Sequence, residues 1–406
     1  MAFSDTVQTT TNLTEGMQTF YSKLFLKWEE QVIRYGQFAT PYDIPKASGK
    51  TMQLFGYRPF AIVDTADVEG VVSANIQTID QRNVTATLKE WSAVAKISTL
   101  ASMTHIDPEL RGVTKLSGDQ AGRTIDNQYG LELGRAGHYP IRVDEVSGAA
   151  GTRNYLEFSP TSAGSTTTII STTVTEATDD RLNGAHIICT AGPNYPWAGR
   201  VTDFVAATDT LTVDPAMPKA SSTSDTFRWV DTIGIAAADI VTSADINQAL
   251  ITAENNIAMP QGDGYYGAVT SPYVLGDIRT DTTWVNAQSY SGVTQLYKGE
   301  VGKWFNIRFA YTTQPYRENA MTGTGGGATN RAAGGVFNTF IFGTESFGGV
   351  RLSGENQKVW VRSWEQLGQS TPSFGTIGWK DIHTAKSTNA MWVIDIISGA
   401  TNVVMT

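Results

Sequence analysis

The sequence is poor in cysteine and in charged residues. Cys189 is the only cysteine among 406 residues, so no disulfide can form within the chain, and stability must come from packing and association. Charged residues make up 17% of the sequence, below the roughly 25% that is usual for soluble domains. We expect so weakly charged a surface where much of it faces other protein. The hydrophobic content of 41% still allows a sizeable core, and the length predicts two or three structural units.

Segments that direct a chain to or through a membrane are also missing. Residues 1–12 are polar and rich in threonine, without the charged and then apolar pattern of a secretory signal. No apolar run approaches the roughly 18 residues that a membrane-spanning helix needs. We therefore expect a soluble chain that is made in the cytoplasm and has no membrane partner.

Basic residues are outnumbered by acidic ones. The formal net charge is -9 at pH 7. A dedicated nucleic-acid-binding protein needs clustered Lys and Arg to neutralise phosphates, so this balance argues against that class. Incidental, non-specific contact with nucleic acid stays open.

Motifs for catalysis and for cofactor or metal binding are absent or incomplete. Residues 48–51 read Ser-Gly-Lys-Thr, like the end of a phosphate-binding loop, but Ile44 stands where that motif needs glycine. Cys189 lies in an apolar, β-branched run, which indicates a small buried side chain rather than a nucleophile. No histidine has the spacing of a metal site, and each is interpreted as an ordinary polar or half-buried residue: His105, His138, His186 and His383. The sequence therefore predicts no enzyme, no catalytic or metal site and no cofactor.

A pair of strand-forming runs without an apolar core beneath it is the most informative feature that is present. In residues 51–57, Met52 and Leu54 fall on one face of the strand. The second run, residues 84–89, alternates at period two, and residues 59–80 between the runs have no helical stripe that could cover a hairpin. Isolated hairpins are marginal in water, and exposed strand edges are normally covered. The pair therefore predicts an arm that rests on another chain.

The first helix is predicted from a capping-box pattern. Asn12 precedes Glu15 by three residues, and an apolar stripe follows at helical spacing: Met17, Phe20, Leu24, Trp28 and Val32. The prolines in residues 40–45 then predict extended or turn geometry before the hairpin.

A longer helix is predicted before residue 138. A helical turn starts at residues 107–110, and Ser117 with Gln120 is expected to cap a helix that ends near Gly137. One face of it carries Ile125, Tyr129 and Leu133. Each interior glycine costs roughly 1 kcal/mol against alanine, so the glycines indicate close packing on a neighbouring element: Gly118, Gly122, Gly130 and Gly134.

The composition changes at about residue 140. From there to about residue 233 it is rich in Thr, Ser and Gly, and short runs predict a small all-β barrel or sandwich: residues 167–174, 184–190, 199–205 and 210–213. Thr242 and Asp245 then cap another helix, and the following alternation of helices and strands predicts a mixed sheet. The glycine-rich residues 322–335 predict a flexible loop.

Residues 298–309 read Lys-Gly-Glu-Val-Gly-Lys-Trp-Phe-Asn-Ile-Arg-Phe. This run resembles the central motif of the major capsid proteins of certain tailed bacteriophages, the podophage-type family with the HK97-like fold. Further blocks resemble the same family: residues 273–281 with Trp284, residues 340–344 and residues 374–380.

The resemblance implies an α+β chain with the HK97-like capsid fold. It covers residues 10–140 by layout and 235–400 by motif. The implied parts are an N-terminal arm (1–47), an extended β-hairpin loop (48–98), a peripheral domain with a spine helix (99–139), an all-β insertion domain (140–233), an axial domain (234–350) and a return to the peripheral domain (351–406). The strands near residues 359–364 and 391–397 would make that return.

For function, the resemblance implies a structural protein of the virion capsid. Copies would form the hexamers and pentamers of an icosahedral head shell around double-stranded DNA, which they would contact non-specifically. Only about 47 residues precede the extended loop, so we expect any scaffolding to be a separate protein, with no N-terminal domain removed. Portal and decoration proteins are further candidate partners. No residue pair matches the Lys–Asn cross-link of some relatives.

We expect the assembly contacts mainly at the aromatic side chains of the extended loop, Phe55, Tyr57 and Trp91, because aromatic side chains dominate interface energetics. Glu300 and Arg308 are expected to form an ion pair in the axial domain. The full set of expected contact residues is Phe55, Tyr57, Arg58, Trp91, Glu300 and Arg308.

Two other classes stay open. The first is another virion component, such as a tail or decoration protein, to which the β insertion could belong. The second is a secreted carbohydrate-active enzyme or binding module, suggested by the 10 tryptophans and the acidic charge. This second class lacks support from a signal peptide or a recognisable acid pair.

Overall fold

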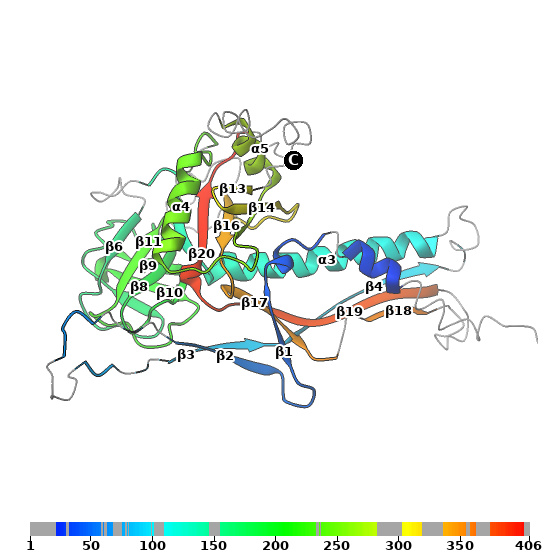
Figure 1. Ribbon diagram of the computed structural model, residues 1–406, viewed down its shortest axis with the longest axis horizontal. Coiled ribbons are helices and arrows are strands. Elements are labelled where there is room, and N and C mark those ends of the chain that lie inside the picture. The colour runs from blue at the N-terminus through cyan, green and yellow to red at the C-terminus, as the bar shows by residue number, and fades with distance from the viewer. Residues whose placement is uncertain are drawn as a thin grey trace, which may run out of the picture.

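The computed structural model is a mixed α+β structure with sheets of five, six and seven strands and a separate two-stranded hairpin (Figure 1). No helix in the described part of the chain is both long and apolar enough to cross a membrane. Short 3-10 helices occupy Tyr35–Gln37 (η1), Ala206–Thr208 (η2) and Ala390–Trp392 (η5). The structure describes residues 22–29, 32–57, 60, 63–67, 75–77, 79, 81–98, 100, 109–145, 155–232, 235, 237–281, 303–318, 336–354, 358–362 and 374–401.

The five-stranded sheet is organised around one long strand, β19 (Phe374–Ser387). Ten residues of β4 (Lys89–Ser98) pair with it in antiparallel register. The other members are β1 (Thr40–Ile44), β17 (Phe347–Leu352) and β18 (Lys358–Arg362). Residues 89–98, which the sequence analysis assigned to the extended loop, therefore form part of this sheet.

A single long helix, α3 (Glu109–Ala136), lies along the five-stranded sheet (Figure 1). The predicted face of Ile125, Tyr129 and Leu133 is confirmed, because each of these side chains is buried. Burying an apolar side chain of this size contributes about 1.5–3 kcal/mol. The predicted start at Ser117 is wrong, since Ser117 lies inside the helix and is buried.

The early start of α3 follows from its contact with residues 22–29, which are helical. The Lys115 ammonium lies 3.8 Å from the centre of the Trp28 ring. A Cβ at Gly118 would lie 2.7 Å from the Phe25 carbonyl oxygen, and one at Gly122 would lie 2.8 Å from that of Glu29. The predicted role of these glycines in close packing is confirmed, and this packing outweighs the local capping signal at Ser117.

The seven-stranded sheet forms the centre of the molecule, with the order β13-β14-β12-β16-β20-β5 and β15 paired to β16. Two helices pack with it: α4 (Ser243–Asn255) and α5 (Pro272–Thr280). The predicted cap of α4 is confirmed, since the Thr242 amide donates to the Asp245 carboxylate at 2.9 Å. Its strands are β5 (Tyr139–Arg142), β12 (Tyr266–Thr270), β13 (Lys303–Trp304), β14 (Ile307–Tyr311), β15 (Arg317–Glu318), β16 (Val336–Phe342) and β20 (Val393–Ser398).

The last strand corrects the predicted layout. Residues 391–397 were expected to return to the peripheral domain beside the spine helix, but β20 runs between β16 and β5 in the seven-stranded sheet. All six of its residues are buried, which explains its position: a strand that is buried on both faces needs a sheet that is covered on both sides. Residues 358–362, by contrast, do lie in the sheet beside α3.

The insertion is all-β, as predicted, and forms a six-stranded sheet with its own core. Trp229, Phe204 and Phe227 lie at the centre of that core. Cys189 is buried there too, and burial raises the pKa of its thiol, which suits the predicted structural role. The strands are β6 (Tyr155–Phe158), β7 (Thr168–Ile170), β8 (His186–Ala191), β9 (Ala198–Val205), β10 (Thr210–Asp214) and β11 (Thr226–Val230).

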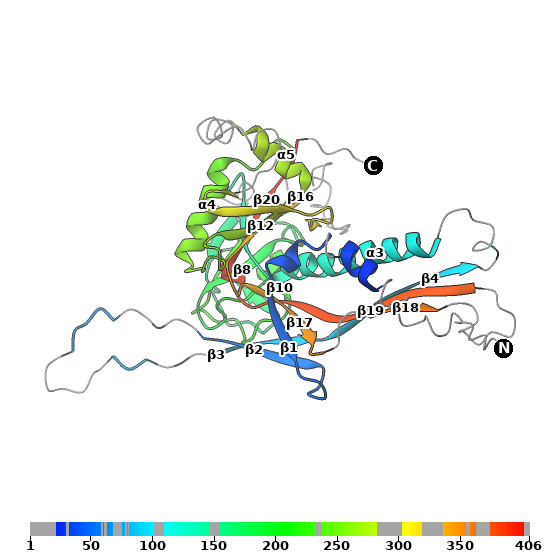
Figure 2. The same cartoon turned by 45° about the vertical axis from the view of Figure 1, so that its right-hand side comes forward.

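The predicted hairpin pairs β2 (Thr51–Tyr57) with β3 (Gln81–Thr87) as a two-stranded sheet of its own, which lies beside β1 in Figure 2. The expectation that it has no core within its own chain is wrong at its base. Leu54 and Ala86 pack against Ile44 and Val350. One face of the hairpin is therefore anchored on β1 and β17, while the opposite face is exposed.

Candidate functional site: an exposed arm, a basic face and a buried histidine pair

The exposed face of the hairpin carries large apolar side chains. Phe55 is 58% exposed and Tyr57 is 71% exposed, because alternation along β2 turns them away from buried Leu54. Four apolar residues beyond the strands are also exposed: Phe60, Val63, Ile76 and Ile79. Monomeric soluble proteins rarely leave large apolar areas in water, so this arm has the character of a contact surface.

The other expected contact residues occupy different environments. Trp91 on β4 is half-buried in its own chain, where its indole nitrogen donates to the His383 carbonyl at 3.3 Å. Arg308 on β14 is exposed, and its guanidinium lies 3.8 Å from the Asp263 carboxylate. Arg58 and Glu300 lie outside the described residues, so the pairing of Glu300 with Arg308 stays a prediction. Phe55 and Tyr57 are thus the described members of the set with the most exposed surface.

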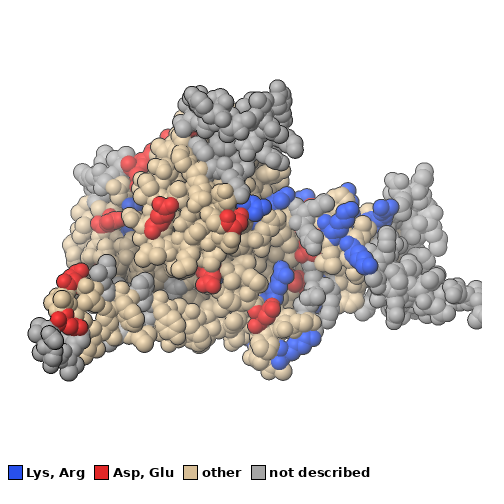
Figure 3. Space-filling model, viewed as in Figure 1, with Lys and Arg blue, Asp and Glu red and all other residues tan. Residues whose placement is uncertain are grey.

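A basic face lies over residues 22–29 and the first half of α3. Figure 3 shows Lys and Arg gathered in this region of the surface. Its members are exposed cationic side chains, and we call them the basic face: Lys23, Lys27, Arg111, Lys115 and Arg123. Arg123 also pairs with Asp119 one helical turn away. The clustering of positive charge in an acidic chain was not predicted, because the residues come from two separated segments.

A buried carboxylate holds the N-terminal segment against α3. Asp126 on α3 accepts from the amides of Arg34 and Tyr35, each at 2.8 Å. It also accepts from the Thr312 hydroxyl at 2.7 Å. Burial raises the pKa of Asp126, and these hydrogen bonds oppose that rise. The Asp126 side chain therefore links three parts of the chain: the residues that enter η1, the spine helix α3 and the segment after β14.

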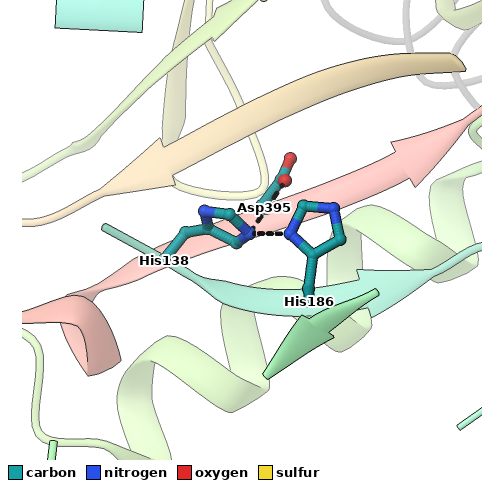
Figure 4. Close-up of side chains that lie close together, drawn as sticks. All are labelled: His138, His186 and Asp395. Atoms are coloured by element: carbon teal, nitrogen blue, oxygen red, sulfur yellow. Dashed lines mark hydrogen bonds and ion pairs between the residues drawn. The ribbon is translucent and has the colours of Figure 1, made fainter. Parts of the chain in front are cut away.

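Two of the four histidines meet in the interior, together with an aspartate (Figure 4). His138 follows α3, His186 begins β8 and Asp395 lies on β20; all three are buried. The Nε2 atom of His138 lies 2.5 Å from Nδ1 of His186 and 3.5 Å from Oδ2 of Asp395. Each of these two histidines was interpreted as an ordinary polar or half-buried residue, whereas both are fully buried and contact one another. The sequence held no signal for this contact, since 48 residues separate the histidines.

A third buried histidine, His383, pairs with an aspartate on β19. Nδ1 of His383 lies 2.6 Å from Oδ2 of Asp381. Burial opposes ionisation of Asp381, but the hydrogen bond and charge of His383 outweigh it and hold the pKa of this carboxyl below its usual range.

Comparison with known proteins identifies the fold. No model of a protein family matches the sequence, and no curated protein matches it. The structure is similar to a chain of the cyanophage Pam1 capsid asymmetric unit, with 12% identity and a TM-score of 0.51 over 89% of each chain. It is also similar to the capsid of Ralstonia phage GP4, with 13% identity and a TM-score of 0.51 over 93% of this chain and 92% of that one. The capsid of cyanophage P-SCSP1u gives 13% identity and a TM-score of 0.50, covering 91% and 88%. The chain therefore has the HK97-like fold of phage capsid proteins, as the resemblance implied.

Proposed function

We propose that this protein is the major capsid subunit of a tailed bacteriophage and self-assembles into the icosahedral head shell around double-stranded DNA. The fold supports the proposal at the level of the whole chain. The observation that carries it further is the arm, whose base is buried in its own chain while Phe55 and Tyr57 remain exposed. In this proposal the partner of the arm is a second copy of the same chain.

In this proposal the protein acts by burial and not by catalysis. Each arm lies across a neighbouring copy within hexamers and pentamers, and many modest interfaces add up to a stable shell. The protein resides in the virion after synthesis in the host cytoplasm. Separate scaffolding, portal and decoration proteins complete the head.

The basic face is the proposed contact with packaged DNA. Its five exposed cations suit a polyanion that is recognised without sequence preference. The whole chain carries a net charge of -9, so DNA contact would need a local cluster of positive charge such as this one. The DNA contact and the arm contact use different surfaces and can be tested separately.

The arm is tested by replacing its aromatic side chains with threonine, which keeps the strand propensity but removes most of the apolar contact area. The double variant Phe55→Thr/Tyr57→Thr is expected to remain folded, because both side chains are exposed in the single chain. It should fail to form shells under conditions in which the unchanged protein assembles, as seen by negative-stain electron microscopy and sedimentation.

The control is Val205→Thr, another exposed apolar residue on a strand, which lies in the insertion. We expect it to leave assembly intact. Shells of normal yield from the double variant would contradict the role of the arm. If the unchanged protein, expressed with its phage neighbours, forms tail-like structures or stays monomeric, the capsid proposal itself is wrong.

A further inference from the structure

The buried histidine pair lies where three parts of the molecule meet. His138 is at the end of the spine helix, His186 belongs to the insertion and Asp395 belongs to the seven-stranded sheet (Figure 4). Their exposed fractions are 3%, 1% and 0%. Buried polar groups of this kind need defined hydrogen bonds, so their protons can be assigned from their partners.

The partners place one proton on each imidazole. Nδ1 of His138 lies 2.6 Å from the Leu133 carbonyl, which can only accept, so this nitrogen carries the proton and Nε2 is an acceptor. At the other end, Nε2 of His186 lies 3.3 Å from a guanidinium nitrogen of Arg200, which can only donate. Nδ1 of His186 therefore carries the proton and donates it to His138.

The result is a directed chain of hydrogen bonds. It runs from Arg200 on β9 through His186 and His138 to the carbonyl of Leu133 on α3. Arg200 also donates to the Gly134 carbonyl through two of its nitrogens, at 2.9 Å and 3.1 Å. The insertion is therefore joined to the end of α3 both by Arg200 and by the histidine pair. In its neutral form the histidine pair satisfies every member of this chain.

The same three side chains offer atoms within 4.8 Å of one another, as a metal site would. A metal ion on Nδ1 of His186 would require the ring proton on Nε2, where it would face the N–H of Arg200. The positive charge of Arg200, a half-buried side chain, would also oppose a divalent cation. The donor set therefore fits a hydrogen-bonded pair and not a metal centre.

Charged groups surround the pair on each side. Asp395 faces His138 and accepts from the Asn338 amide at 2.5 Å, while Arg200 faces His186. The pKa of the buried Tyr35 phenol is raised by burial first, then by the Asp126 carboxylate and then by Asp395, so Tyr35 also lies near this cluster. Arg200 also lines an open groove of about 400 Å³ together with Glu132 and Arg135.

We propose that the His138–His186 pair is a proton-sensitive lock, which holds the insertion against the end of the spine helix when neutral and releases it when it takes up a proton. A second proton has no place in the existing chain of donors. On Nε2 of His138 it can turn to Asp395, but the donating Nδ1–H of His186 then faces another N–H. If His186 shifts its own proton to Nε2, that proton faces Arg200. Either arrangement breaks a contact between β8 or β9 and the rest of the molecule.

The proton positions can be measured directly. The chain has only four histidines, so ¹⁵N-histidine labelling gives few ring signals, and His138→Gln and His186→Gln assign them by loss. At neutral pH we expect the proton on Nδ1 in both rings. A proton on Nε2 of His186 would overturn the lock. So would stoichiometric uptake of added Zn²⁺ that shifts both sets of ring signals, because it would identify a metal site.

Release can be followed by hydrogen exchange of the amides in β8 and β9, corrected for intrinsic rates, on the full unassembled chain. If each opening takes up one proton, the protection factors of these amides should fall about tenfold for every pH unit below about 6.5, the usual imidazole range. In His186→Gln these amides should exchange faster at neutral pH but lose this pH dependence, since the glutamine side chain can turn its amide oxygen to accept from a protonated His138.

His383→Gln is the matched control, because it removes another buried histidine that lies outside the cluster. It should keep the pH dependence of β8 and β9. Equal pH dependence in His186→Gln and the unchanged chain would overturn the proposal. If a variant does not fold, the measurement of the ring protons in the unchanged chain still tests the proposed lock. The lock is a property of the single chain, so its failure would be independent of whether shells form.

Discussion

Individual side chains decide how closely the parts of this molecule approach one another. Asp126 ties the N-terminal segment to the spine helix, and Gly122 lets that segment come within van der Waals distance of it. His383 with Asp381 places a buried polar pair in the five-stranded sheet. These contacts involve single atoms, so each can be tested by a small substitution.

Gly122→Ala is expected to destabilise the protein. The added Cβ would lie 2.8 Å from the Glu29 carbonyl oxygen, and overpacking of this kind costs about 1–3 kcal/mol. The better helix propensity of alanine offsets roughly 1 kcal/mol of that cost. Denaturant unfolding should therefore show a lower free energy of unfolding for this variant.

Gly112→Ala on the same helix is the control, because a Cβ there meets nothing within 4 Å. It should raise the free energy of unfolding by up to about 1 kcal/mol. The same effect from both substitutions would show that close packing of residues 22–29 does not explain Gly122.

Asp381→Asn is expected to lower stability in a pH-dependent way. The pKa of Asp381 is held below its usual value in the folded state, so its contribution is present above the unfolded pKa of about 3.9. The contribution disappears as pH falls through the lower folded value. A hydrogen bond to a charged group contributes about 1.5–3 kcal/mol, which sets the expected loss at pH 7.

Urea unfolding at pH 7, 5 and 3 measures the difference between the unchanged chain and Asp381→Asn. This difference in the free energy of unfolding should have its full size at pH 7 and 5 and should be smaller at pH 3. A difference that stays constant down to pH 3 would rule out the ionised carboxylate as its source.

At the scale of elements, the hairpin has two faces with separate tasks. Its inner face, through Leu54 and Ala86, holds it on β1 and β17. Its outer face carries Phe55 and Tyr57. Period-two alternation makes this division possible, because successive side chains point to opposite sides of a strand. Anchoring and contact with a partner can therefore be changed independently.

Leu54→Ala is expected to loosen the hairpin without unfolding the rest of the chain. Truncating a core leucine costs about 2–5 kcal/mol. Because the cluster around Leu54 is small, we expect a loss of about 2 kcal/mol. This corresponds to about thirtyfold faster hydrogen exchange of β2 and β3 amides. Phe55→Ala, next in sequence but exposed, should leave that exchange nearly unchanged. Unaltered exchange in Leu54→Ala would mean that the hairpin does not depend on this anchor.

At the scale of the whole molecule, charge and apolar surface occupy different regions. The basic face covers residues 22–29 and the first half of α3 (Figure 3), while the exposed apolar side chains Phe55 and Tyr57 belong to β2 of the hairpin. A shell subunit needs such a division, because protein neighbours and nucleic acid contact it from different sides. The proposal for DNA follows from this arrangement.

The triple variant Lys23→Gln/Lys27→Gln/Arg111→Gln is expected to weaken binding to duplex DNA. Each lost phosphate contact should reduce the slope of log affinity against log salt by about 0.9. Binding of the unassembled chain to a short duplex at several salt concentrations measures this slope. Arg308→Gln removes an exposed cation outside the basic face and should leave the slope unchanged. Equal slopes for the triple variant and the unchanged chain would contradict the DNA contact.

The sequence by itself determined the local elements and several of their faces. Alternation placed Leu54 and Phe55 on opposite faces of β2, the apolar spacing of Ile125, Tyr129 and Leu133 fixed the face of α3, and turn residues with β-prone runs marked the insertion. Short motifs also carried the resemblance that the fold comparison bears out. Such patterns depend on neighbours along the chain, so they can be read without the tertiary structure.

The tertiary structure alone decided which distant segments meet. It placed β20 in the central sheet, continued α3 past Ser117 through contact with residues 22–29, and anchored the hairpin on β17. It also brought His138 and His186 together across 48 residues. Long-range pairing is set by burial and by the shape of the assembled sheets, and no local pattern in the sequence encodes those.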